Sequence, residues 1–441
     1  MSALETVTTP PPLTPADRPP LPERVKSPQR AAAELLGVGL AVVLLALATG
    51  TIDVVIFAAC IIVIVMLHEL GHLLAAKHGG MKVTEYFLGF GPRLWSITRG
   101  ETEYGVKVLP LGGYVKIPGM TNLEEVDPAD EARTYRQQPF GARMLVAVAG
   151  SAMHFLIAFV LLWVLLTFVG QPDTSQVQVQ GFASIAGHEA PALQGGLRNG
   201  DIVVSIDGVR VGGDEDRMAK VIQAHPGAPV PVVVDRSGRT LTLRITPLDG
   251  RTVDETGLTP PPGHAPFGVI GAEFGSPNVR TGPVRALGDS VVDLGRLAWS
   301  TVVGVVHVFS PSAVAGRFHQ VTSAKAAAQA TANGTRVQSI VGVVDTGGQA
   351  VQAGIADTLW LLIVINLFLG VFNLFPMLPL DGGHVAIAVY ERIRTGRSKR
   401  PYHADAAKLM PFTWLMLAFL GVLFTTALLV DVLHPMANPF G

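Results

Sequence analysis

The chain has 441 residues, of which 49% are hydrophobic and only 15% are charged. Soluble globular domains carry about 25% charged residues, so this composition points to an integral membrane protein. A formal net charge of −1 excludes a bulk electrostatic attraction to nucleic acid, and the single cysteine, Cys60, excludes an intrachain disulfide and speaks against a cysteine-ligated zinc site.

The N-terminal region predicts a tail followed by a short apolar helix. Proline and polar residues dominate 1–33, which we interpret as a disordered cytoplasmic tail. The apolar run at 34–50 is shorter than the about 20 residues that usually span a membrane. Basic residues before it and Ala46-Leu47-Ala48 within it also fit a signal peptide. The length of the preceding tail favours an extra transmembrane helix.

The second apolar run, 54–77, contains the sequence HELGH. His68 and His72 are four residues apart, so they share one helical face and can bind the same metal ion. Glu69 lies about 100° around the helix, where it can take a proton from a metal-activated water and pass it to a leaving amine. H-E-x-x-H is the zinc metalloprotease pattern. Histidines that only pack against neighbouring helices are the alternative, but an ionisable side chain at membrane depth costs roughly 2.5–3.5 kcal/mol and indicates a function.

The region 82–118 alternates apolar and polar residues on two arms around a Thr-Arg-Gly turn, which is the pattern of a β hairpin. It is apolar enough to lie against the membrane, and Gly112 and Gly113 allow a second backbone to come close. The run at 142–169 then predicts another transmembrane helix. We therefore expect a membrane-associated β region between two spans.

The segment 174–249 predicts a small β-rich domain with one short helix. Its motifs resemble those of the PDZ domains in bacterial envelope proteases, and they are Gly196-Leu197, Gly200-Asp201-Ile202 and Ile206-Asp207-Gly208. Such domains add a peptide strand to a sheet edge or capture a C-terminus. A β-rich spacer is the alternative. The segment 281–311 predicts an amphipathic helix that lies at the membrane surface or packs on the outer domain, because its apolar core is too short to span and is flanked by Asp293 and Arg296.

The run at 356–379 predicts a transmembrane helix that leads to Asp381. Two prolines in the sequence FPMLPLD break this helix, and non-helical backbone at membrane depth is tolerated where it lines a cavity. We therefore predict Asp381 as the third metal ligand, with His384 as a less favoured alternative. Asn373 can donate a hydrogen bond to an oxyanion or to substrate backbone.

A last run at 410–433 completes the predicted spans. Lysine and arginine accumulate in the tail and in the loops 77–142 and 391–408, so the positive-inside rule places these segments in the cytoplasm. The long segment between the spans 142–169 and 356–379, with the PDZ-like domain, is then extracytoplasmic. We expect a multi-pass protein of the plasma membrane with a cytoplasmic N-terminus.

In this order the motifs resemble the bacterial site-2 proteases, which are intramembrane zinc metalloproteases with a PDZ insert. The resemblance covers about 54–435 and implies a polytopic α-helical membrane protein with a four-helix core, to which the helix at 34–50 is an addition. It implies Zn²⁺ as the cofactor. The implied site consists of the zinc ligands His68, His72 and Asp381, the catalytic acid and base Glu69, and the oxyanion- or substrate-binding residues Asn373, Gly112 and Gly113.

Two residues at the start of the second core helix, Ser151 and His154, depart from the family, which often has proline and asparagine there. We expect His154 to pack inside the protein, with contact to the substrate or tuning of the cavity as the alternatives. The resemblance nevertheless implies hydrolysis of peptide bonds within or near the transmembrane segment of single-span membrane proteins, with the PDZ domain gating access. Anti-sigma factors already cut by another protease and leftover signal peptides are the substrates that it implies.

Two other functions explain the sequence less completely than proteolysis in the lipid bilayer. A catalytically silent PDZ scaffold predicts a degraded catalytic motif, whereas HELGH and the later Asp-Gly sequence are intact. A metal transporter or sensor predicts polar residues spread along several spans, and it leaves Glu69 and the PDZ-like motifs without a role. The sequence therefore favours an enzyme.

Overall fold

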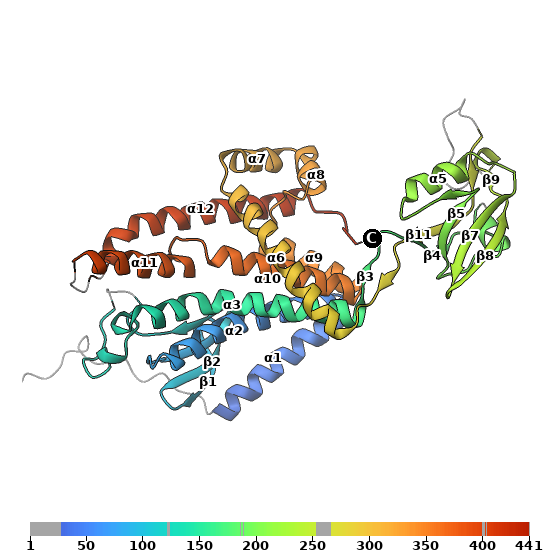
Figure 1. Cartoon of the computed structure of the whole chain (residues 1–441). Coiled ribbons are helices and arrows are strands. Elements are labelled where there is room, and N and C mark those ends of the chain that lie inside the picture. Colours follow the sequence, from blue (N-terminus) through green and yellow to red (C-terminus); the bar gives the residue numbers. More distant parts are fainter. Residues whose placement is uncertain are drawn as a thin grey trace, which may run out of the picture. The chain divides into compact units, whose positions relative to one another are not determined.

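The computed structural model describes residues 28–120, 124–185, 187, 189–252, 266–398, 402 and 404–440. The chain forms two compact units, Met1–Gly150 with His384–Trp414 and Ser151–Gly383 with Leu415–Gly441. Figure 1 labels the helices and strands of both units. The predicted tail at 1–33 lies mostly outside the described residues, and its last residues, from Pro28 onward, belong to a helix.

The first unit begins with two apolar helices, α1 (Pro28–Thr49) and α2 (Ile52–His78). Gly50 between them has a φ of 70°, a conformation that residues with a side chain rarely adopt, so the chain reverses within two residues. α3 (Phe140–Val164) starts in this unit and passes close to α2. A Cβ atom on Gly71 would lie 2.6 Å from the carbonyl oxygen of Ala149, so glycine is needed for the two helix backbones to approach.

The β region of this unit is a hairpin that bends back on itself. Its strands are β1 (Glu85–Arg99) and β2 (Thr102–Lys116). Leu88 pairs with both Val106 and Gly113, so the chain around Leu88 has a strand on each side. Within the described residues, the segment 113–116 pairs only with the segment around Leu88 and forms one edge of the resulting sheet. An edge of this kind offers unpaired backbone groups to another extended chain.

The second unit contains the packing of α3 against α10 (Ile355–Asn373). Apolar side chains of both helices form one cluster, to which α6 (Pro283–Val308) adds Leu294 and Leu297. α3 ends in a π-helical turn, Leu165–Val169. This unit also contains α7 (Pro311–Thr322), α8 (Ala324–Ala332), α9 (Ile340–Ala353) and most of α12 (Ala406–Leu433).

Six helices in the described part of the chain are long and apolar enough to cross a membrane. They are Ala32–Thr49, Ile52–His78, Phe140–Val169, Pro283–Val308, Ile355–Asn373 and Lys408–Leu433. The protein is a polytopic helical membrane protein, and this prediction from composition is confirmed. α6 is longer than the apolar core that the sequence indicated within 281–311. It has 26 residues, and its length and composition would allow it to cross a membrane. Its placement at the membrane surface stays a prediction.

A β domain with its own apolar core lies between α3 and α6 in the sequence (Figure 1). Its main sheet has the strand order β11-β4-β5-β7-β8, with β6 beside β5. The elements around this core are β4 (Val177–Phe182), α4 (Pro191–Gln194), β5 (Ile202–Ile206), β6 (Val209–Arg210), α5 (Glu215–Gln223), β7 (Val230–Arg236), β8 (Arg239–Ile245) and β11 (Ala272–Gly275). The sheet thus includes β11, which lies beyond the predicted domain end at 249. The sequence alone did not indicate this strand, because its partner β4 lies far away in the sequence.

Short strand pairs flank this sheet. β3 (Gln171–Pro172) pairs with β12 (Asn278–Val279) where the chain enters and leaves the domain, and β9 (Leu248–Asp249) pairs with β10 (Gly268–Val269). The pairing of β3 with β12 brings the two connections of the domain together, as expected for an inserted domain. The resemblance of this domain to PDZ domains stays a prediction.

Asp201 anchors the β domain, and we expect its removal to destabilise that domain. Its buried carboxylate accepts two hydrogen bonds of 2.7 Å from Arg236 and one of 2.9 Å from the backbone N–H of Arg198. Burial acts to raise the pKa of Asp201, but these hydrogen bonds outweigh it and lower the pKa. The carboxylate therefore contributes stability above its unfolded pKa of about 3.9, and this contribution is lost as the pH falls further.

The Asp201→Ala variant should lose about 3 kcal/mol of domain stability at pH 7, because it leaves Arg236 without its partner. Hydrogen exchange of peptides from β5 and β7 in the full-length protein measures this loss. Replacing the exposed Asp216 with alanine is the control, and it should change the stability by less than about 0.5 kcal/mol. Equal exchange in the two variants would contradict the anchoring role.

Candidate functional site

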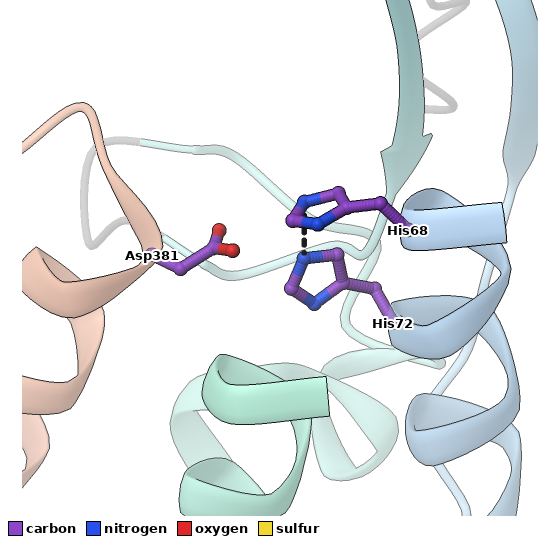
Figure 2. Close-up of side chains that lie close together, drawn as sticks. All are labelled: His68, His72 and Asp381. Atoms are coloured by element: carbon purple, nitrogen blue, oxygen red, sulfur yellow. Dashed lines mark hydrogen bonds between the residues drawn. The ribbon is translucent and has the colours of Figure 1, made fainter. Parts of the chain in front are cut away.

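The two histidines of HELGH lie one turn apart on α2 and face each other (Figure 2). His68 is 7% exposed and His72 is 6% exposed, and their Nε2 atoms are 3.2 Å apart. The rings meet edge to face, with an angle of 81° between their planes. Burial of two imidazoles with converging nitrogens inside an apolar helix is the arrangement of a metal site.

A hydrogen bond that His72 donates to α3 orients its ring. The carbonyl oxygen of Val146 accepts this bond from Nδ1 of His72 at 2.8 Å, so Nδ1 carries the proton and Nε2 keeps its lone pair. Two nitrogens bound at 2.0–2.1 Å to one tetrahedral zinc are about 3.3 Å apart. The 3.2 Å between the Nε2 atoms of His68 and His72 matches this separation. The pair is therefore spaced and oriented for one zinc ion.

Gly150 of α3 packs directly against both imidazoles. A Cβ atom at this position would lie 2.3 Å from Nε2 of His72 and 2.4 Å from Cε1 of His68. Such distances are far below van der Waals contact, so no larger residue fits here while the histidines keep their places. Gly150 is not among the site residues predicted from the sequence, although its neighbours Ser151 and His154 are noted there as departures from the family. A glycine within a membrane helix was the available signal, because small residues mark the close approach of helices.

Glu69 lies beside the edge of the β region. A Cβ atom on Gly113 would lie 3.1 Å from Cγ of Glu69 and 2.9 Å from Sδ of Met66. Tyr86 of β1 donates a hydrogen bond of 2.7 Å to the carbonyl oxygen of Met66, which fixes the sheet to α2. Burial, aided by the negative charge of Glu69, raises the pKa of Tyr86 to about 12, so this hydroxyl keeps its proton at neutral pH. The edge segment 113–116 therefore starts next to the glutamate.

Gly112 precedes this contact with a φ of 131°, a conformation that favours glycine. A Cβ atom on Gly112 would lie 3.3 Å from the ring of Phe90. The two glycines therefore serve different purposes: Gly112 lets the backbone turn, and Gly113 leaves room for Glu69. Both purposes suit an edge that another backbone approaches.

Asp381 is the first residue of α11 (Asp381–Ser398). Between the end of α10 and Asp381 the backbone is not helical and folds back on the start of α11. A Cβ atom on Gly382 would lie 2.2 Å from the carbonyl oxygen of Leu374, and one on Gly383 would lie 2.6 Å from the nitrogen of Leu378. The glycine pair of the Asp-Gly-Gly sequence is therefore required by the turn that presents Asp381.

Three predicted ligands come together in the described part of the chain. One ligand atom each from His68, His72 and Asp381 lies within 4.8 Å of the others, and Figure 2 shows the Asp381 carboxylate directed toward the imidazoles. Two imidazoles and one carboxylate are a donor set of catalytic zinc sites, so these residues fit the metal. His384 is not in this group, and its ring packs edge-on against Tyr135 with the ring centroids 6.2 Å apart.

The second unit contains a buried polar pair, His154 of α3 and Asn366 of α10, and Asn366 lies on the face of α10 that also carries Asn373. Nδ1 of His154 lies 3.1 Å from Oδ1 of Asn366, and both side chains are buried. His154 thus packs inside the protein. Asn366, Gly370 and Asn373 share one face of α10 at the i, i+4 and i+7 spacing, so Asn373 continues the face that contacts His154. Sequence reasoning did not single out Asn366.

Known zinc metalloproteases match the sequence along most of its length. The model described as "Peptidase family M50" matches residues 56–419. "Zinc metalloprotease Rip1" from Mycobacterium tuberculosis is 35% identical over 424 residues, covering 88% of this chain and 97% of the relative. A putative zinc metalloprotease from Rhizobium meliloti is 27% identical, covering 82% and 92%. "Probable membrane metalloprotease ARASP2, chloroplastic" from Arabidopsis thaliana is 26% identical, covering 85% and 79%.

Proposed function

Because this chain belongs to peptidase family M50 and is a zinc metalloprotease of the membrane, we propose that it cuts single-span membrane proteins within or near their transmembrane segments. HELGH lies well inside α2, a helix long and apolar enough to span. A peptide bond must therefore reach the catalytic residues at membrane depth. This placement favours a substrate that is itself a membrane segment over a soluble protein.

In this proposal His68, His72 and Asp381 hold the zinc. The observation that carries it is the 3.2 Å between the two Nε2 atoms, together with the hydrogen bond that His72 Nδ1 donates to the Val146 carbonyl oxygen, which leaves the lone pair of His72 on Nε2. Bound zinc supplies a Lewis acid that polarises the scissile carbonyl and acidifies the attacking water. These three ligands would leave a fourth coordination position for water, as a catalytic zinc site requires.

The remaining chemistry falls to protein side chains. Glu69 accepts the proton of the attacking water and then donates it to the nitrogen of the leaving amine, so one carboxylate serves both steps. Asn373 donates a hydrogen bond to the oxygen of the scissile carbonyl as negative charge develops there. Its side chain is half-buried, and the described residues give it no hydrogen-bond partner.

The edge segment 113–116 is the proposed binding strand for the substrate. A helical peptide bond is shielded by its own hydrogen bonds, so the substrate must unwind before it can be cut. An extended chain added to this edge gains backbone hydrogen bonds in return. Because Gly113 packs against Glu69, a substrate strand on this edge would run beside the catalytic carboxylate.

The finer architecture belongs to the same proposal. α2, α3, α10 and α12 form the four-helix core, α1 is an addition, and the β domain is a PDZ domain outside the plasma membrane. A PDZ domain there can admit substrates already shortened by another protease, such as an anti-sigma factor, or leftover signal peptides, and exclude intact ones. Support comes from the basic segments that the positive-inside rule places in the cytoplasm.

The ligand role of Asp381 is testable by metal binding. We expect the Asp381→Asn variant to bind zinc at least about 100-fold more weakly, because loss of a ligand should exceed the loss caused by outer-shell changes. Competition with a chelator on the purified protein measures the affinity. The exposed Asp345 provides a matched control, and its replacement by asparagine should leave the affinity unchanged. Full affinity in Asp381→Asn would refute the assignment.

A further inference from the structure

One face of α3 touches two other helices at the site. Arg143, Val146 and Gly150 share this face at the i, i+3 and i+7 spacing. The Val146 carbonyl oxygen accepts the hydrogen bond of His72, and Gly150 packs against the imidazoles. Arg143, at the other end of the face, forms an ion pair with Glu391 of α11. α3 therefore contacts both the helix of the histidines and the helix that begins with the aspartate.

The Arg143–Glu391 ion pair is buried and held on several sides. The two side chains are 9% and 8% exposed. The other carboxylate oxygen of Glu391 accepts a hydrogen bond of 2.6 Å from the backbone N–H of Ala404. The guanidinium of Arg143 also lies over the ring of Tyr135, 5.5 Å from its centroid. A buried ion pair adds little net stability, because desolvation offsets the attraction, but it permits only a narrow range of geometries.

Two positions on one face of α11, about two helical turns apart, contact the rest of the first unit. His384, Ala388 and Glu391 share this face at the i, i+4 and i+7 spacing. The ring of His384 packs against Tyr135, Ala388 is buried, and Glu391 binds the arginine of α3. Contacts two turns apart resist both rotation of the helix about its axis and sliding along it. Asp381 lies only three residues before His384, so these contacts also set the place of its carboxylate.

We propose that Arg143 and Glu391 are positioning residues for the third zinc ligand. By holding α11 on α3, the ion pair keeps the Asp381 carboxylate at the separation from His68 and His72 at which all three bind one zinc ion. This inference rests on the proposed ligand role of Asp381. An ion pair that served the fold alone would change stability without acting through that carboxylate.

A double-mutant cycle separates these two roles. The full-length protein is purified in detergent, freed of metal, and titrated with zinc against a chelator, and its visible absorption is recorded with Co²⁺. Glu391→Gln should weaken zinc binding at least about tenfold, as expected for loss of an orienting interaction. Its Co²⁺ spectrum should shift toward that of Asp381→Asn. In the Asp381→Asn background, Glu391→Gln should cause no further loss.

The second unit offers a matched control. Arg336 and Asp431 form another buried ion pair, 2.9 Å long, with side chains 5% and 8% exposed. Asp431→Asn should lower the thermal unfolding midpoint as Glu391→Gln does, yet leave the zinc affinity within about twofold of the starting protein. A weakening of zinc binding by Asp431→Asn equal to that of Glu391→Gln would show a general effect of lost stability.

The cycle distinguishes the two proposals when they fail. If Asp381→Asn weakens zinc binding and Glu391→Gln does not, or does so by the same factor in both backgrounds, the positioning role is wrong and the ligand role stands. If Asp381→Asn leaves the affinity unchanged, the ligand role is wrong and the positioning role falls with it. Should Glu391→Gln fail to fold, Arg143→Lys, which retains the charge, gives the same cycle.

Discussion

The Glu69→Gln variant is expected to keep its zinc and lose its proteolytic activity. Glutamine has nearly the same shape as glutamate but cannot accept the proton of the attacking water. Removal of a general acid and base typically lowers the rate by about 10²–10⁴-fold. Glu69 lies on α2 but is not one of the three predicted metal ligands. Its replacement should therefore leave those ligands in place.

The measurement is cleavage of a co-expressed single-span membrane protein, followed by immunoblotting, together with the zinc content of the purified enzyme. Glu215 in the β domain is exposed, and Glu215→Gln is the control that should cut normally. Unimpaired cleavage by the Glu69→Gln variant would contradict the proposed mechanism. Loss of zinc along with activity would instead assign Glu69 a part in metal binding.

The Gly150→Ala variant is expected to lose zinc as well as activity, although it adds a single methyl group. That methyl would lie 2.3 Å from Nε2 of His72, the atom that must face the metal. Either the imidazoles turn away or α3 moves back from α2, and overpacking of this kind costs about 1–3 kcal/mol. Both responses spoil the spacing of the two histidines, so stoichiometric zinc should disappear from the purified protein.

Gly141 provides the control on the same helix. A Cβ atom there meets nothing within 4 Å, so Gly141→Ala should leave zinc and activity intact and stabilise α3 by up to about 1 kcal/mol through helix propensity. The comparison holds the chemical change constant and varies only its place. Normal zinc content in Gly150→Ala would mean that the histidines do not use the side that faces α3.

Local patterns and distant contacts differ in what they reveal beforehand. The sequence HELGH names two donors and a carboxylate on one helix, because helical spacing alone brings them together. Membrane character, zinc and proteolysis followed from such local signals and are confirmed by the family. The local signal at Gly150 is only that of a small residue in a membrane helix, and its contact with the histidines depends on how closely α3 approaches α2. The same holds for Glu391, whose partner Arg143 is 248 residues away.

The β regions illustrate the same limit. The alternation in 82–118 predicts a hairpin. It does not predict that the hairpin bends back on itself, so that Leu88 pairs with both Val106 and Gly113. This bend depends on the register in which the strand segments pair, and the side-chain pattern of a glycine-rich strand specifies that register only weakly. The β domain takes β11 from beyond its predicted end for a related reason: a strand of four residues is too short to be recognised until its partner β4 is known.

The contact of Gly150 with the imidazoles also bears on how the enzyme can be inhibited. α3 covers one side of the histidine pair so closely that a methyl group does not fit. A chelating drug therefore has to reach the metal from another direction, and the segment that begins at Gly113 offers one beside Glu69. Compounds that join a zinc-binding group to an extended peptide backbone suit this approach, whereas bulky aromatic chelators that need room on both sides of the imidazoles do not.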